Sequence, residues 1–325
     1  MERAQLTSTT AGPAASGAPM IRVRGLVKRY GHLTAVDGVD LEVRDREIFG
    51  ILGPNGAGKT TTLEMIEGLR EPDSGSIEVD GIDAVKHPTQ VKRVIGIQLQ
   101  TTALFDHLTV RELVGLFADL YDADSSKKRI DWLIGLVSLE EKAGSYVNEL
   151  SGGQQQRLSI ALALVNDPRV VFLDEPTTGL DPQARRNLWE AIAGIRNSGK
   201  TVVLTTHYME EAEILCDRVA VMDAGRIIAC DTPRDLIEGL NLGSTILARV
   251  SRGTVSLDEL RRLPAVTDAH RDGDQLSLRT GDVAATVSAL LLAAEREGWH
   301  LEDLTMTRAS LEDVFLHYTG RSLRE

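Results

Sequence analysis

Several apolar segments of this chain are each followed by residues that can handle phosphate, a metal ion or a proton. The first segment leads into the run GPNGAGKT, at residues 53–60, and apolar residues at helical spacing follow that run. Glycines allow successive backbone N–H groups to wrap around phosphate oxygens, and the start of a helix adds its dipole to that attraction. A structural glycine-rich turn is the alternative interpretation. The complete pattern between a strand and a helix instead predicts a phosphate-binding loop of the Walker A type.

Each residue of this loop has an expected part in binding a nucleoside triphosphate. Lys59 would contact the β- and γ-phosphates, Thr60 would ligate Mg²⁺, and Thr61 would contact the α-phosphate side. Lys59 is also expected to take part in the reaction itself. The predicted nucleotide contacts in this loop are Gly53, Pro54, Asn55, Gly56, Ala57, Gly58, Lys59, Thr60 and Thr61.

Two carboxylates end a second apolar segment, VVFLDE, at residues 170–175. Because a parallel sheet opens toward bound phosphate at the carboxyl ends of its strands, both side chains are expected to face the nucleotide. Asp174 would hold Mg²⁺, partly through water, and Glu175 would polarise the attacking water. Alone, the segment would be better interpreted as a strand that ends in a solvated acidic turn. Together with the glycine-rich loop, it predicts a Walker B strand.

The segment LSGGQ, at residues 150–154, places a hydroxyl and two glycine amides at the start of a predicted helix. A helix start of this kind also binds phosphate. Since the chain already has a phosphate-binding loop, a second such site implies either a second ligand or a second copy of the protein. With these motifs in this order, residues 21–236 resemble the nucleotide-binding subunit of an ATP-binding cassette (ABC) transporter.

The resemblance implies a head-to-tail homodimer with two composite sites that bind ATP and Mg²⁺. In this arrangement Ser151 and Gly153 of one subunit reach the γ-phosphate held by Lys59 of the other. Gln154 completes the same signature motif, and Asp181, in the run GLDP, matches the aspartate at the dimer seam. Binding of ATP would close the dimer, and hydrolysis would let the two halves part.

Three further residues acquire expected roles from the resemblance. Gln100 matches the glutamine that contacts Mg²⁺ or water and relays closure to the membrane subunit; Gln98 is the alternative, but it falls within the predicted strand. His207, after residues 202–206, matches the histidine that touches the γ-phosphate, although a lone histidine is more often structural. Tyr30 matches the aromatic residue that stacks on adenine, with core packing as its alternative, so ATP rather than GTP is the expected nucleotide.

The order of predicted elements indicates an α/β fold of the P-loop NTPase, ABC ATPase class in residues 20–240. The predicted strands of its sheet include residues 47–52, 94–99, 170–173, 202–205 and 218–222. Residues 101–165 have apolar side chains at three-to-four spacing, which predicts a helical subdomain. Residues 241–325 follow the order strand, helix, strand, strand, helix, strand and predict a small α+β, ferredoxin-like accessory domain.

Three predicted apolar faces have assigned residues. Two lie in the helical subdomain: one consists of Leu113, Leu116, Phe117 and Leu120, and the other of Ile130, Leu133, Ile134 and Val137. The third belongs to the final helix, consists of Leu311, Val314 and Phe315, and is expected to close the small domain.

Composition excludes some classes of protein. The chain of 325 residues has 36 basic and 48 acidic side chains, a net charge of −12, which gives no electrostatic basis for binding nucleic acid. Its two cysteines are too few for a disulfide framework and too widely spaced for a zinc site or redox pair, which fits a reducing compartment. The longest nearly apolar stretch, residues 284–294, is too short to cross a bilayer, so a membrane-spanning permease is expected to be a separate chain. Residues 1–19 lack the apolar core of a signal peptide and predict a disordered leader, with Met1 and Met20 both open as the start.

The run SLEDVFLHYTGR, at residues 310–321, is similar to the tail of bacterial ATP-binding proteins of the daunorubicin and doxorubicin resistance type. That resemblance implies a peripheral ATPase on the cytoplasmic face of a bacterial membrane, which drives the export of drugs or other hydrophobic compounds through the permease. A soluble ATP-driven switch that acts on a ribosome, nucleic acid or protein partner is the alternative function. Association with a membrane protein would separate the two.

Overall fold

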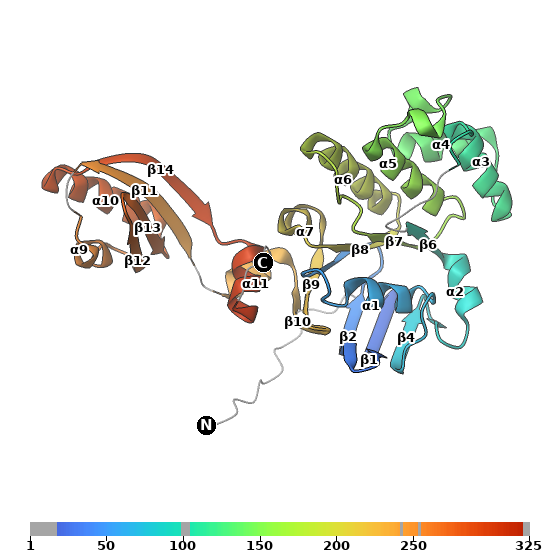
Figure 1. Cartoon of the computed structure of the whole chain (residues 1–325), viewed down its shortest axis with the longest axis horizontal. Helices are drawn as coiled ribbons and strands as arrows, with labels where there is room; N and C mark the ends of the chain where they lie inside the picture. The colour runs from blue at the N-terminus through green and yellow to red at the C-terminus, as the bar shows by residue number, and fades with distance from the viewer. Residues whose placement is uncertain (1–17, 99–104, 241–242, 253–254, 321–325) are drawn as a thin grey trace.

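The computed structural model describes residues 18–98, 105–240, 243–252 and 255–320. The expected leader lies almost entirely outside these residues, and Gln100 lies outside them too. Three sheets organise the described residues, two of them between residues 21 and 231 and one between residues 244 and 308 (Figure 1).

A six-stranded sheet forms the centre of the larger part of the molecule. Its strand order is β10-β9-β3-β8-β7-β6; the strands from β9 to β6 run parallel, and β10 pairs antiparallel with β9. The strands are β3 (Ile48–Leu52), β6 (Ile95–Gln98), β7 (Val170–Asp174), β8 (Thr201–Thr206), β9 (Arg218–Asp223) and β10 (Arg226–Asp231). Each predicted strand is present, and the described ends of each strand differ from the predicted ends by at most one residue. Strands β3, β7 and β8 are buried throughout, as expected for parallel strands covered on both faces.

Two separate apolar cores cover the two faces of this sheet. Because side chains alternate along a strand, Phe172 of β7 joins one core, whereas Val171 and Leu173 join the other. The Phe172 side is covered by α1 and an antiparallel sheet of order β2-β1-β4-β5, and α2 follows that sheet (Figure 1). These elements are β1 (Ile21–Tyr30), β2 (Leu33–Val43), α1 (Lys59–Ile66), β4 (Ser74–Val79), β5 (Ile82–Asp83) and α2 (Pro88–Val94).

The opposite face is covered by helices, most of which belong to the expected helical subdomain. Its elements are α3 (Val110–Leu120), α4 (Lys127–Leu136), the short 3-10 helices Glu140–Lys142 and Val147–Glu149, and α5 (Gly152–Ala163). The prediction of a helical region is therefore confirmed for its described residues. Helices α6 (Pro182–Asn197), α7 (Met209–Leu215) and α8 (Pro233–Gly239) complete this side.

The apolar face predicted for α3 is wrong in part. Leu113 is buried, but Leu116 is 37% exposed and Leu120 is 70% exposed. The buried residues of α3 are Val110, Leu113, Val114 and Ala118. These four residues also recur at helical spacing, so they define the buried face of α3. Leu116 and Leu120 lie outside that face.

The third sheet belongs to the small C-terminal part and has a core of its own. Its elements follow the predicted order: β11 (Ser244–Arg252), α9 (Leu257–Arg261), β12 (Val266–Asp272), β13 (Gln275–Thr280), α10 (Val283–Glu297) and β14 (His300–Arg308). All of its pairings are antiparallel, in the strand order β12-β13-β11-β14. This is the order that a split βαβ arrangement produces.

The final helix, α11 (Leu311–Thr319), does not close the small domain, so that prediction is wrong. Its three apolar residues join the core of the larger part, where α11 packs against α7 and α8 (Figure 1). The Leu311 backbone N–H donates to Glu213 Oε1 of α7 at 2.7 Å. After β14 the chain therefore returns to the larger part, which offers the apolar surface that buries this helix. The division of the chain at residue 240 stays a prediction.

Candidate active site

The glycine-rich loop connects the carboxyl end of β3 to α1. Gly56 and Gly58 have φ angles of 80° and 100°, in the left-handed region that favours glycine. A Cβ atom on Gly58 would lie only 2.3 Å from the carbonyl oxygen of Ala35. The tight turn that a phosphate cradle requires thus depends on glycine at this position.

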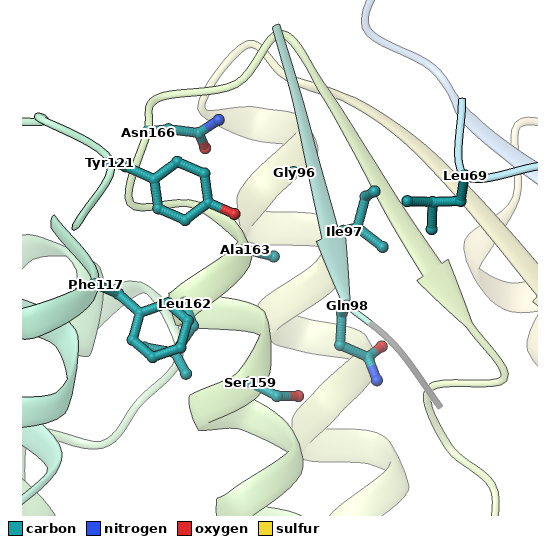
Figure 2. A pocket seen from close by; sticks show the side chains of 10 residues that line it. All are labelled: Leu69, Gly96, Ile97, Gln98, Phe117, Tyr121, Ser159, Leu162, Ala163 and Asn166. Carbon is teal, nitrogen blue, oxygen red and sulfur yellow. The ribbon is translucent and has the colours of Figure 1, made fainter. Parts of the chain in front are cut away.

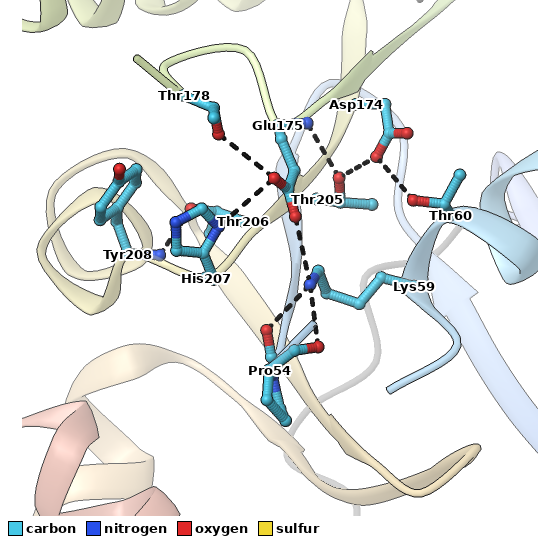
Figure 3. Close-up of polar contacts among 11 residues, drawn as sticks. Pro54, Lys59, Thr60, Asp174, Glu175, Thr178, Thr205, Thr206, His207 and Tyr208 are labelled. Carbon is cyan, nitrogen blue, oxygen red and sulfur yellow. Dashed lines mark hydrogen bonds and ion pairs between the residues drawn. The ribbon is translucent and has the colours of Figure 1, made fainter. Parts of the chain in front are cut away.

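Lys59 begins α1 and is only 4% exposed. Its ammonium group donates to the carbonyl oxygens of Gly53 at 2.9 Å and Pro54 at 3.1 Å. It also lies 3.3 Å from Glu175 Oε1 (Figure 3). A buried cation held by exchangeable oxygen partners at the mouth of this loop is well placed to meet phosphate oxygens.

Two threonines, one from α1 and one from the end of β8, contact the Walker B carboxylate at the end of β7. Asp174 Oδ1 accepts hydrogen bonds from the hydroxyls of Thr60, at 3.3 Å, and Thr205 (Figure 3). Thr205 also accepts a hydrogen bond from the Glu175 backbone N–H at 3.0 Å. Sequence reasoning did not assign Thr205 this role. The available signal was a hydroxyl in the apolar strand that precedes His207.

Glu175 is held in an unusual conformation beside Lys59 and His207. Its φ angle of 46° lies in the left-handed region, which is rare for a residue with a side chain. Its Oε2 atom lies 3.4 Å from His207 Nδ1 and accepts from the Thr178 hydroxyl at 3.2 Å. Burial raises the pKa of Glu175, but Lys59 and His207 outweigh burial and leave that pKa below its ordinary value. The carboxylate is therefore ionised at neutral pH and can accept a proton.

A cavity of ≈ 630 Å³ joins half of the sequence-predicted residues. It is lined by Tyr30, Leu33, Ala35, Asn55, Gly56, Gly58, Lys59, Thr60, Thr61, Glu175, Thr178 and His207. Leu33 and Ala35, on β2, were not predicted from sequence. Tyr30 is 41% exposed, which excludes the core-packing alternative. Arg70 and Lys28, which are not among the lining residues, place their cations 5.4 and 5.9 Å from the centre of this ring.

The predicted signature and seam residues do not line this cavity. Ser151 caps the amino end of α5, where its Oγ atom accepts from the Gln154 N–H at 3.4 Å. Asp181 caps α6 in the same way, and both capping residues are exposed. Gly153 packs close to Ala184 of α6, because a Cβ atom there would lie 2.9 Å from the Ala184 Cβ atom. Two exposed helix starts therefore stand apart from the cavity of their own chain.

A second cavity, of ≈ 270 Å³, lies between β6 and the helical subdomain (Figure 2). Gln98, the alternative to Gln100, is buried and lines it, together with Phe117 and Tyr121 of the α3 region. Strand β6 passes very close to α5, since a Cβ atom on Gly96 would lie 1.8 Å from the Ala163 carbonyl oxygen. Gln98 thus belongs to the wall between the two subdomains, whereas Gln100 lies outside the described residues.

Glu67 is a buried carboxylate next to this machinery that sequence reasoning missed. It caps the carboxyl end of α1 and is 2% exposed. Burial, together with the smaller effects of the negative charges of Asp174 and Glu64, raises the pKa of Glu67 to about 8. Between its ordinary value of 4.5 and about 8, the folded chain therefore holds a proton that the unfolded chain has released.

We expect Glu67→Gln to stabilise the fold at high pH. Because the folded state binds more protons between pH 4.5 and about 8, the free energy of unfolding of the native protein falls as pH rises through this interval. Glutamine has no proton to lose, so the variant should melt several degrees higher than the native chain at pH 8.5 and at a similar temperature at pH 5. Thermal unfolding in a chelating buffer measures this. Glu190→Gln, at an exposed position, is the control, and the same Tm difference at both pH values would contradict the expectation.

Comparison with known proteins identifies the family to which these motifs belong. A family profile described as "ABC transporter" matches residues 36–178. The chain is 40% identical over 316 residues to Nod factor export ATP-binding protein I of Ralstonia nicotianae, with 97% of this chain and 98% of that protein covered. The chain belongs to the ABC transporter ATP-binding family. Two further relatives of this ABC ATPase are named for resistance.

One is daunorubicin resistance ATP-binding protein DrrA3 of Streptomyces coeruleorubidus, 39% identical over 308 residues, with 94% of this chain and 97% of that protein covered. The other is linearmycin resistance ATP-binding protein LnrL of Bacillus subtilis, 36% identical over 312 residues, with 94% and 100% covered. Solved structures agree on the fold. The dimeric structure of a bacterial ABC transporter cassette is 30% identical with a TM-score of 0.59 and covers 66% of this ABC ATPase and 98% of its own chain.

A second solved cassette, cbiO1 from Clostridium perfringens, is 29% identical with a TM-score of 0.63 and covers 70% of this ABC ATPase and 96% of its own chain. The predicted P-loop NTPase class is thereby confirmed, and the chain is the ATP-binding, ATP-hydrolysing subunit of an ABC transporter. No helix in the described part of the chain has the length and apolar character needed to span a membrane.

Proposed function

We propose that this ABC ATPase hydrolyses ATP in a head-to-tail homodimer and thereby drives a separate membrane permease that exports drugs or other hydrophobic compounds. One observation carries the dimer. The cavity collects the phosphate loop, Glu175 and His207, whereas Ser151 and Asp181 are exposed at helix starts outside it. A phosphate held in the cavity would therefore meet Ser151, Gly153 and Gln154 only from a second copy of the chain.

Within each composite site we assign the residues as follows. Tyr30 stacks on adenine from the rim of the cavity, and Lys59 exchanges its contacts with the loop carbonyls for the β- and γ-phosphates. Glu175, ionised and close to the phosphate loop, accepts a proton from the attacking water. His207, 3.4 Å from Glu175, contacts the γ-phosphate as negative charge develops there.

The residues present fit a magnesium ion. Thr60 Oγ1 and Asp174 Oδ1 lie 3.3 Å apart, and hydroxyl and carboxylate oxygens are the donors that Mg²⁺ prefers. Gln100 is proposed as a further ligand, at a position outside the described residues. When bound beside the phosphates, the ion would neutralise part of their negative charge.

We propose that the permease docks over the second cavity. Its wall includes Leu69 and Tyr121, which are 48% and 57% exposed, and Leu120, the sequence neighbour of Tyr121, is 70% exposed. Apolar side chains that the fold leaves uncovered in this way are typical of a protein interface. The site adjoins Gln98, so closure around ATP could reach the permease through β6. The chain would then work at the cytoplasmic face of the bacterial membrane.

Export is the direction favoured by the names of the relatives, which describe Nod factor export and resistance to daunorubicin and linearmycin. The substrate would be selected by the permease, since the cavities described above serve nucleotide binding and docking. No role in binding nucleic acid is proposed, because the net charge of −12 opposes association with a polyanion.

We expect the Glu175→Gln protein, captured from detergent-extracted native membranes in Mg-ATP, to bring with it a polytopic membrane protein. The variant should remain bound to ATP and so hold the transporter in one state. Mass spectrometry of the captured material is the measurement. The matched control is Lys59→Ala, which should not hold ATP and should capture less of the same protein. Recovery of ribosomal or other soluble partners alone would favour a non-transport switch instead.

A further inference from the structure

Helix α7 carries a carboxylate for which the proposed mechanism has no role. Glu211 is 0% exposed, and its Oε1 atom accepts a hydrogen bond from the Trp189 Nε1–H of α6 at 3.1 Å. α7 lies against α6 and begins two residues after His207 (Figure 1). A fully buried carboxylate is costly unless hydrogen bonds or opposite charges compensate it.

The surroundings of Glu211 come from three segments. Trp189 donates the hydrogen bond described above, and the hydroxyls of Thr177 and Thr206 lower the pKa of the carboxylate, although burial is the larger influence and raises the pKa of Glu211. Thr177 follows Glu175 by two residues, and Thr206 directly precedes His207. The helix that carries Trp189 begins at the Asp181 cap.

Part of this cluster is not fully bonded. Glu211 Oε2, Thr177 Oγ1 and Arg185 Nε are buried and make no hydrogen bond to the residues that the structure describes. The Arg185 guanidinium lies 4.4 Å from the ring centre of Tyr208, the neighbour of His207, and its charge favours an ionised Glu211. One acceptor and two donors are thus available for a tighter arrangement of the same segments.

We propose that Glu211 is a positioning residue for ATP hydrolysis. Its buried carboxylate ties α7, which follows the γ-phosphate histidine, to α6, which begins at the dimer-seam aspartate, and it adjoins the segment that follows the proton-accepting glutamate. A displacement of about 1 Å at such groups can cost about 10²-fold in rate, so one central acceptor has a large effect on turnover. The inference rests on the proposed roles of Glu175 and His207.

The test compares substitutions around this carboxylate in the full-length chain. Glu211→Leu removes the acceptor at similar volume and should lower kcat by about 10- to 100-fold, with the KM for Mg-ATP within ~3-fold of the native value. Glu211→Gln keeps an acceptor for Trp189 and should retain kcat within ~3-fold. Trp189→Phe keeps an aromatic ring, removes the donor and should lower kcat several-fold. If the leucine variant does not fold, the comparison of Trp189→Phe with Glu211→Gln decides.

A matched control separates positioning from stability. Glu47 is also a buried carboxylate, 6% exposed, but it lies at the amino end of β3 with Arg218 3.3 Å away. Glu47→Leu should lower the Tm while leaving kcat of the folded protein unchanged. A Glu211→Leu variant that loses Tm but keeps native kcat would overturn the proposal.

A double substitution gives a readout that a purely structural role would not move. If Glu211 acts by placing His207, then Glu211→Leu should lower kcat by less than ~3-fold once His207 is already alanine. If the fold-loss of kcat in the double variant equals the product of the two single fold-losses, the proposal is overturned. The single His207→Ala and Glu175→Gln variants are measured alongside. If they keep native turnover, the proposed function fails; if they lose it while Glu211→Leu does not, only the positioning role fails.

Discussion

Replacing Glu175 by glutamine is expected to lower kcat for ATP hydrolysis by about 10²- to 10⁴-fold, the usual contribution of a general base. The amide keeps the size of the side chain but cannot accept a proton from water. Burial raises the pKa of Glu175, but the effects of Lys59 and His207 lower this pKa by more. The native group is therefore a carboxylate at neutral pH. Because the variant keeps Tyr30 and the phosphate loop, its affinity for ATP should stay within ~3-fold of native.

The same variant should accumulate as a dimer in Mg-ATP, since ATP would close the two subunits and slow hydrolysis would keep them closed. Steady-state phosphate release and size-exclusion chromatography measure the two effects. Glu47→Gln, which alters a buried carboxylate at the opposite end of β3, should leave both unchanged. Equal turnover in the Glu175→Gln and native proteins would remove Glu175 as the base.

Much of the fold and of the candidate site could be predicted from the sequence, because these features depend on local patterns. Glycine spacing fixed the loop at residues 53–60, and apolar runs that end in polar residues fixed the strands beside it. Thr205 was missed because its role comes from strand pairing: β8 lies next to β7, and this puts its hydroxyl on Asp174. No local pattern marks such a neighbour.

The two incorrect predictions, for α3 and α11, have a common physical cause. Helical spacing shows that a helix has an apolar face, but the neighbouring elements decide which residues are covered and by what. In α3 the face centred on Leu113 is buried, and Leu120 remains exposed. In α11 the apolar residues were identified, but they pack on α7 and α8 across a long separation in sequence. Glu211 was missed for the same reason, since its burial depends on Trp189 of another helix.

Ser151→Arg is expected to abolish most ATP hydrolysis while leaving ATP binding to the single chain within ~3-fold of native. In the proposed dimer the arginine side chain, which is much larger than that of serine, would intrude on the γ-phosphate site of the partner. In its own chain the side chain is exposed and lies outside the nucleotide cavity, so no direct effect on binding is expected. Loss of the helix cap itself should cost only about 1 kcal/mol of stability.

A matched control has the same local chemistry at a different helix. Ser126 is exposed and caps α4, where its Oγ atom accepts from the Arg129 N–H at 3.3 Å. Ser126→Arg should therefore lose a similar amount of stability and keep its ATPase activity. ATPase assays, nucleotide titration and thermal unfolding of both variants separate the effect of the partner site from that of the cap. Hydrolysis that survives Ser151→Arg would contradict the composite site.

Mixing two inactive variants tests the head-to-tail arrangement directly. Lys59→Ala disables the phosphate loop, and Ser151→Arg disables the signature motif that the same chain offers to its partner. In a mixed dimer both defects fall in one composite site, and the other site is intact. Random pairing makes about half of the dimers mixed, each with one good site, so the mixture should recover about a quarter of native activity. Activity can recover on mixing only if each site is built from two chains, because only then can both defects fall in the same site. If both variants are folded and the mixture stays inactive, the two motifs do not meet across a dimer.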